Sequence, residues 1–185
     1  GGNLFLKLAG ELGKNPPSEL RSVVGISPVI DLAPSSDALH LPQNRIYEMK
    51  FVRAMVRRFR RKAALFPRAY DPNRVSGISS LRDFDEQIIS LYSGFSGAED
   101  YYYRVAAARV IDDITVPTLI LNSLDDPFIR LAADTREKIL ANPSITFLET
   151  AQGGHCAFLD QPDPARGYDG YWAEHVLTRF ILANS

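Results

Sequence analysis

Apolar residues along the chain follow two kinds of pattern. Short continuous apolar runs, each bounded by turn-forming residues, are typical of strands, and the β-branched run at 23–30 has the pattern of a strand buried on both faces. These runs lie at 23–30, 116–122 and 145–150. Apolar positions that recur on one side of a 3.6-residue period predict helices instead. Such segments lie at 2–13, 44–65, about 130–141 and about 168–183.

Strands that alternate with helices are expected to form a parallel sheet with crossover helices. One long segment, about 32–112, interrupts this alternation between the first and second strands. Within it, 31–43 is rich in proline and serine and predicts a loop, and 80–109 predicts short helices broken at Gly94 and Gly97. We therefore expect an α/β fold of three parallel strands, with a core formed by 1–31 and 113–185 and a helical insertion at 32–112.

Composition narrows the class of protein without assigning a function. A length of 185 residues fits one domain, or one domain with an insertion. The net charge of −1 gives no overall reason to expect nucleic acid or membrane as a partner. The single cysteine, Cys156, excludes an internal disulfide and favours a reducing compartment. No signal-peptide pattern and no apolar run of roughly 20 residues is present, so a cytoplasmic location is expected.

The charge is unevenly distributed, because cations cover the face of the predicted helix at 44–65 that its apolar stripe leaves open. They are Lys50, Arg53, Arg57, Arg58, Arg60, Arg61 and Lys62. A solvated helix face, an anionic lipid surface and nucleic acid are three interpretations of this pattern. Nucleic acid is the least favoured, since no base-stacking aromatic residues are interleaved on the charged face.

Two side chains suited to acid–base chemistry follow the second and third predicted strands. Asp126 lies in the acidic turn after 116–122, and His155 follows a glycine turn after 145–150. Carboxyl ends of parallel strands meet at one edge of a sheet, so an acid–imidazole pair of the kind found in Ser-His-Asp hydrolases is expected there. Asp125 is the rival acid, with a turn or helix cap as its alternative role. Cys156, next to His155, is expected to be a small buried filler, and no residue cluster has the spacing of a metal site.

The order of several segments resembles the α/β-hydrolase fold, and within it the YheT-like group of esterases and acylglycerol hydrolases. The segments are Gly1-Gly2-Asn3, Ser27-Pro28-Val29-Ile30-Asp31-Leu32, Phe84-Asp85, Val116-Pro117-Thr118, Asp125-Asp126-Pro127-Phe128 and Gly153-Gly154-His155. The resemblance implies that the chain matches the C-terminal part of such a protein. It makes Asp126 the triad acid and His155 the triad base, and it prefers Asp126 over Asp125 because Pro127 follows.

The same resemblance implies a serine carboxylic-ester hydrolase that acts through an acyl-enzyme on a small ester or an acyl lipid, without a cofactor or metal. The nucleophile would stand two places before Gly1, so the 185-residue chain alone is expected to be inactive. The strand near 22–30 would expose an edge that the preceding part of the protein, or another copy, covers. The alternative is a non-catalytic fragment that binds a membrane surface or a protein partner through the basic helix at 44–65.

Overall fold

The chain forms two units that are compact in themselves. The computed structural model describes residues 1–185, apart from the side chain of Arg166. Unit 1 contains Gly1–Asp31 and Ala106–Ser185, and unit 2 contains Leu32–Val105. That these two units act as a catalytic core and its cap remains a prediction.

Unit 1 has the expected α/β fold. Its three strands are parallel and lie in the order β1-β2-β3. Its strands and α-helices are α1 (Gly2–Leu12), β1 (Val23–Ile26), β2 (Thr118–Ser123), α7 (Ala133–Ala141), β3 (Ile145–Thr150) and α8 (Trp172–Ala183). Short 3-10 helices occupy Ala107–Arg109, Ile111–Asp113 and Pro164–Arg166. The first strand is shorter than predicted, because Ser27 has a φ of 42° and the following Pro28 has no N–H to donate to a ladder.

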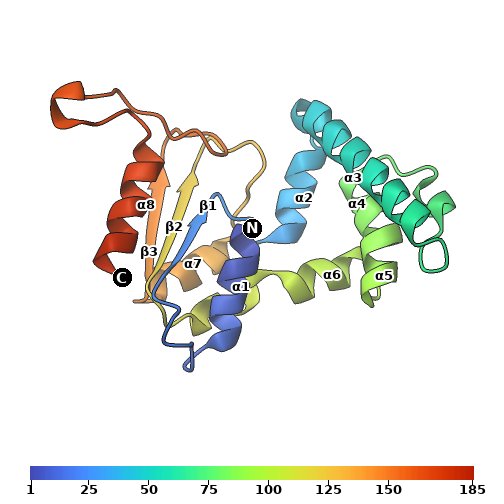
Figure 1. Cartoon of the computed structure of the whole chain (residues 1–185), viewed down its shortest axis with the longest axis horizontal. Coiled ribbons are helices and arrows are strands. Elements are labelled where there is room, and N and C mark those ends of the chain that lie inside the picture. Colours follow the sequence, from blue (N-terminus) through green and yellow to red (C-terminus); the bar gives the residue numbers. More distant parts are fainter. The chain divides into compact units, whose positions relative to one another are not determined.

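Helices cover both faces of the sheet, which explains why β2, the central strand, is apolar and buried along its whole length. Successive strand residues point to opposite faces. Ile120 packs with α1 and α7 on one face, and Leu121 packs with Phe158 and Ala173 on the face that α8 covers. Figure 1 shows this layering, with α8 on one side of the three arrows and α1 and α7 on the other.

Two glycines let α1 approach its neighbours closely. A side chain at Gly2 would bring its Cβ to 2.8 Å from the Cβ of Pro28, and one at Gly10 would bring it to 2.2 Å from the carbonyl oxygen of Val110. A Cβ atom at either position could not approach its neighbour this closely unless the neighbouring atoms moved. Gly2 therefore seats the first turn of α1 directly against the residues that follow β1.

Asp31 connects the end of the first segment of unit 1 to helix α7. Its carboxylate accepts hydrogen bonds from the backbone N–H of Ala132 and the hydroxyl of Thr135, both at 2.9 Å. A carboxylate is stabilised at a helix N-terminus by the unpaired N–H groups there. This bond fixes α7, which connects the two strands that carry the candidate acid and base.

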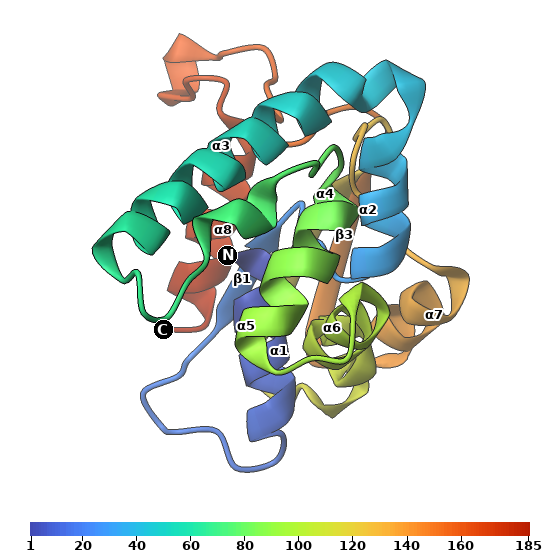
Figure 2. The same ribbon diagram turned by 90° about the vertical axis from the view of Figure 1, so that its right-hand side faces the viewer.

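Unit 2 contains helices and connecting loops, and no strand among its described residues. It comprises α2 (Leu32–His40), α3 (Arg45–Leu65), α4 (Leu81–Phe84), a π-helical segment (Asp85–Ser90), α5 (Leu91–Ser93) and α6 (Ala98–Val105), with 3-10 helices at Pro42–Asn44 and Pro72–Val75. Figure 2 shows α2 beside the N-terminal end of the long helix α3. The aromatic rings of Phe59 and Phe84 join α3 to α4, at a centroid separation of 6.5 Å.

The loop predicted at 31–43 was wrong, because Leu32–His40 forms helix α2. Pro34 suggested a loop, but it lies in the first turn of the helix, where an N–H has no helical partner in any case. Ser35 and Ser36 are buried there. The serines that appeared to be loop residues are therefore small residues of a packed helix face.

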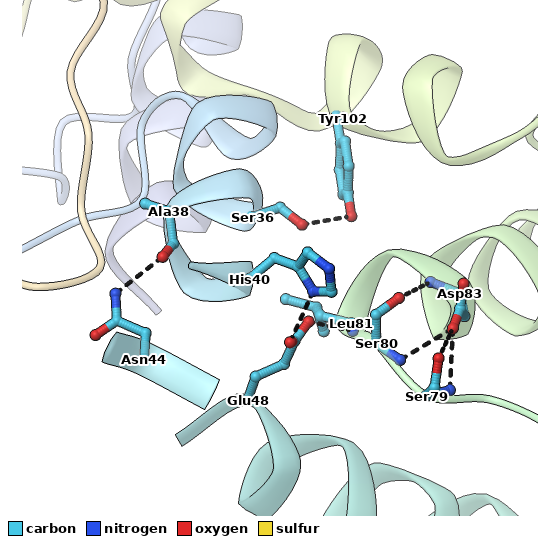
Figure 3. Close-up of polar contacts among 10 residues, drawn as sticks. All are labelled: Ser36, Ala38, His40, Asn44, Glu48, Ser79, Ser80, Leu81, Asp83 and Tyr102. Carbon is cyan, nitrogen blue, oxygen red and sulfur yellow. Dashed lines mark hydrogen bonds and ion pairs between the residues drawn. The ribbon is translucent and has the colours of Figure 1, made fainter. Parts of the chain in front are cut away.

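Buried polar groups connect the helices of unit 2 (Figure 3). The carboxylate of Glu48 in α3 contacts Nδ1 of His40 at 2.9 Å and accepts the backbone N–H of Leu81 at 3.0 Å. The hydroxyl of Tyr102 lies 3.0 Å from that of Ser36. Tyr102 also donates to the carboxylate of Asp85 at 2.7 Å, and burial raises the pKa of Asp85 to about 6. Unit 2 is therefore held together by paired polar groups as well as by its aromatic core.

Candidate active site

Asp126 is held at the end of β2 by backbone hydrogen bonds. It is only 3% exposed. Its Oδ1 accepts the N–H of Phe128 at 2.8 Å and that of Ile129 at 3.0 Å. Both donors follow Pro127, whose fixed φ helps to set this turn. One carboxylate oxygen is thus occupied by the backbone, and Oδ2 is left to contact another side chain.

His155 supplies that contact from the end of β3. Its Nδ1 lies 2.9 Å from Oδ2 of Asp126, and its side chain is 43% exposed. The ring of Phe128 stands edge-on to the imidazole, at a centroid separation of 5.5 Å. Because Asp126 occupies Nδ1, Nε2 is the nitrogen that remains for proton exchange with a ligand. The structure thus brings Asp126 and His155 together; their catalytic roles stay a prediction.

Asp126 and His155 each shift the pKa of the other in the direction that favours a carboxylate beside a protonated imidazole. The hydrogen bond to Asp126 raises the pKa of His155 above its ordinary value, and partial burial only partly offsets this. Burial opposes ionisation of Asp126, but the hydrogen bonds from His155 and from the N–H groups of Phe128 and Ile129 outweigh it and lower the pKa of that carboxyl. Asp126 is therefore an anion at neutral pH, suited to stabilising a cationic imidazole.

Asp125 takes a part that the sequence did not reveal. Its Oδ1 accepts the backbone N–H of Gly154 at 2.8 Å, and Ser123 donates its hydroxyl to the carbonyl of Gly154 at 2.6 Å. Gly154 itself has a φ of 59°, a conformation that glycine adopts without strain. Asp125 and Ser123 thus clamp the turn before His155 to the end of β2. The only sequence signal for this was a second acid beside Asp126.

Replacing Asp125 with asparagine should loosen this turn without removing the acid–imidazole pair. The negative charge of Asp125 makes its hydrogen bond with Gly154 strong. That hydrogen bond in turn lowers the pKa of Asp125. We expect the amide hydrogen of Gly154 to exchange at least about tenfold faster, since exchange reports local opening, while the pKa of His155 stays raised by its hydrogen bond to Asp126. NMR exchange and titration measure both. The matched control is Asp134→Asn on helix α7; equal behaviour of the two variants would exclude the clamp.

Cys156 lies next to His155 but is exposed. The expectation of a buried filler was wrong, because the turn after the glycines faces solvent and Phe158 fills the space below it. A side chain at Gly153 would come within 2.6 Å of the Phe158 ring. Among the side chains that the structure describes, no group of three or more potential ligands could hold a metal ion.

Curated proteins of known name are similar to this chain. Phospholipase ABHD3 of Bos taurus is 29% identical over 187 residues, which cover 99% of this chain and 44% of the relative. The putative esterase YheT of Escherichia coli is 27% identical, over 86% of this chain and 46% of its own length. Medium-chain fatty acid ethyl ester synthase/esterase 2 of Saccharomyces cerevisiae is 33% identical, over 58% of this chain and 22% of its own length.

These three matches each span less than half of the relative. No family model and no solved structure matches the chain. No helix among the described residues is long and apolar enough to cross a membrane. The names of the relatives all denote proteins that cleave or form esters. The parallel sheet has the α/β architecture expected for the C-terminal part of an α/β-hydrolase, and the chain is similar in sequence to proteins that include phospholipase ABHD3 and the putative esterase YheT.

Proposed function

We propose that this chain is part of a serine carboxylic-ester hydrolase of the esterase or acylglycerol lipase type. The observation that carries the proposal is the 2.9 Å contact between His155 Nδ1 and Asp126 Oδ2, made at the ends of adjacent parallel strands. In the reaction, Nε2 of His155 accepts the proton of a serine hydroxyl as that oxygen attacks the ester carbonyl. The imidazolium then protonates the departing alcohol, and water releases the acyl group in a second step.

The serine belongs to the longer protein, two places before Gly1. The packing of Gly2 against Pro28 supports this placement, because a turn from a strand into a helix with little room for side chains is what a nucleophile elbow requires. Asp126 keeps the imidazole in the tautomer that leaves Nε2 free to accept. No cofactor or metal is needed for this chemistry.

The substrate class is a small ester or an acyl lipid. The names of the relatives, a phospholipase and a medium-chain fatty acid ethyl ester synthase/esterase, support it. β1 is paired within the described residues only to β2, so the other edge of β1 would be covered by the preceding part of the longer protein or by a second copy. A cytoplasmic location stays a prediction.

A fluorophosphonate probe tests the proposal directly, since it labels activated serine hydroxyls. We expect the longer protein to be labelled at the serine two places before Gly1. The 185-residue chain alone should stay unlabelled, although it carries Asp126 and His155. Labelling of any serine within the 185 residues would contradict the assignment of the nucleophile.

A second candidate function is binding to an anionic membrane surface through α3. Its outward face carries Lys50, Arg53, Arg57, Arg60 and Arg61, and no described carboxylate pairs with any of them. Unpaired cations in a row are attracted to anionic lipid headgroups at about 1 kcal/mol each. Contact with a membrane would bring an acyl-lipid hydrolase to its substrate.

Sedimentation with lipid vesicles tests this second function. We expect binding to vesicles rich in phosphatidylserine, and a loss of at least about tenfold in affinity when Arg53 and Arg57 are both replaced by glutamate. The attraction should weaken at high salt, because it is a screened surface interaction. Equal binding to neutral phosphatidylcholine vesicles, or no effect of the double variant, would rule it out.

A further inference from the structure

The candidate acid lies in a segment without regular structure. Residues 126–132, which we call the acid turn, form neither helix nor strand. One end of the acid turn is fixed by the two backbone N–H groups that Oδ1 of Asp126 accepts, and the other by the bond from Ala132 to Asp31. A segment of this kind has no regular ladder of backbone hydrogen bonds to hold its carbonyl groups. Side chains must therefore supply that support.

The side chain of Arg130 holds the carbonyl groups of the acid turn. Its Nη1 donates to the carbonyl oxygens of Asp126 and Ile129, both at 2.8 Å. Its Nη2 makes a longer bond, of 3.4 Å, to the carbonyl oxygen of Pro127. A guanidinium is planar and presents its N–H donors in a rigid fork. These bonds therefore fix the three carbonyl groups relative to one another.

The positive charge of Arg130 matters as much as its shape. Carbonyl oxygens carry partial negative charge, and those of Asp126, Pro127 and Ile129 converge on one side chain. Without a cation between them, these oxygens would repel one another. Hydrogen bonds from a charged donor are also about twice as strong as those between neutral groups. Arg130 is half-buried, so water screens these bonds only in part.

The backbone that Arg130 holds is that of the candidate acid itself. Oδ2 of Asp126 lies 2.9 Å from Nδ1 of His155. The direction of the Asp126 side chain follows from the orientation of its backbone, which the bond from Arg130 to its carbonyl fixes. Hydrogen bonds weaken steeply as their angle departs from linear. A small rotation of the Asp126 backbone would therefore weaken the contact with the imidazole.

We propose that Arg130 is a positioning residue for the acid–imidazole pair. Its guanidinium holds the acid turn so that Oδ2 of Asp126 stays in hydrogen-bonding contact with Nδ1 of His155. Arg130 acts through Asp126 rather than on the ester. Its effect on catalysis rests on the proposed hydrolase function, whereas its effect on the pair does not.

A nearby cation could also act on His155 through its electric field, and the two modes of action have opposite signs. A positive charge opposes protonation of an imidazole, so removing the charge alone would raise the pKa of His155. Loss of the contact with Asp126 would instead lower that pKa toward its ordinary value, because this hydrogen bond is what raises it. The sign of the change therefore separates positioning from a field effect.

The test is NMR titration of His155 in the longer protein, with Arg130 replaced by methionine. We expect the pKa of His155 to fall and the acid limb of the kcat/KM profile to move to lower pH with it. At the pH plateau kcat should fall by about 10²-fold, the size of effect that a small misplacement of a catalytic group produces, while KM changes little. Arg130→Lys should keep the pKa raised, because one ammonium nitrogen in the place of Nη1 could make both of its short bonds.

The matched control is Arg179→Met, which removes the same charge from an exposed position of α8 and should leave kcat within about twofold. A pKa of His155 that is unchanged or raised in Arg130→Met would overturn the proposal. Should circular dichroism show that this variant is unfolded, Arg130→Gln, which keeps one amide donor, must give the same fall. A wild-type pKa that is not raised would refute the pairing behind the proposed function. A raised pKa that Arg130→Met leaves unchanged would refute only the role of Arg130.

Discussion

Replacing His155 with alanine is expected to lower kcat for p-nitrophenyl ester hydrolysis by the longer protein by about 10⁶-fold. The reason is that the imidazole of His155 is held by Asp126 through Nδ1 and has Nε2 left to accept the serine proton. The fold should survive, because the side chain of His155 is 43% exposed and contributes little to the core. A loss of less than about tenfold would exclude the role of general base.

The pH dependence of the wild-type protein provides an independent check on His155. Hydrolysis needs the neutral imidazole, so activity is lost as the pH falls through the pKa of His155. The hydrogen bond to Asp126 raises that pKa, and the acid limb of the kcat/KM profile is therefore expected above the ordinary histidine value of about 6.5. The limb is measured in the free enzyme over a pH series with the same ester. A limb well below that value would contradict the pairing with Asp126.

Replacing Asp126 with asparagine is expected to cost less activity than the loss of His155, near 10⁴-fold in kcat. Asparagine has nearly the same shape and can still accept the N–H groups of Phe128 and Ile129. Its amide would donate toward Nδ1 of His155, however, and so favour the tautomer that carries its proton on Nε2. A serine cannot give a proton to an Nε2 that already holds one. The measurement is kcat and KM with a p-nitrophenyl ester.

The control for Asp126→Asn is Asp125→Asn in the same longer protein. Both changes remove one negative charge from the same turn, so a general electrostatic effect would lower both activities alike. The structure pairs only Asp126 with the imidazole, whereas Asp125 accepts from the Gly154 backbone. We expect the Asp125 variant to retain far more activity than the Asp126 variant. The reverse order would exchange the roles of the two acids. A variant at Asp126 should also lower the pKa of His155, which NMR titration detects.

Sequence patterns alone predicted the sheet well, for a reason that lies in the residues themselves. Ile145–Thr150 forms the third strand as expected, and Thr118–Ser123 lies within two residues of the expected second strand. Both segments are rich in β-branched and apolar residues, which favour strands. The central strand β2 is buried along its whole length, whereas β3 is only partly buried. Helix α2 was missed, because a proline in a first helical turn and one in a loop look the same without knowledge of the helix's packing surface.

For the candidate site too, the sequence determined one part and the tertiary structure another. The sequence determined which residue types follow which strands. Asp126, followed by Pro127, comes after the second strand, and His155, preceded by two glycines, comes after the third. Only the tertiary structure decided that Oδ2 of Asp126 contacts His155 and that Asp125 contacts the glycine turn. The local sequence pattern determines the periodicity of apolar residues, and hence which segments form helices or strands. Contacts between residues 29 apart, or between a helix and a π-helical turn, depend instead on register and packing, which no short window of sequence contains.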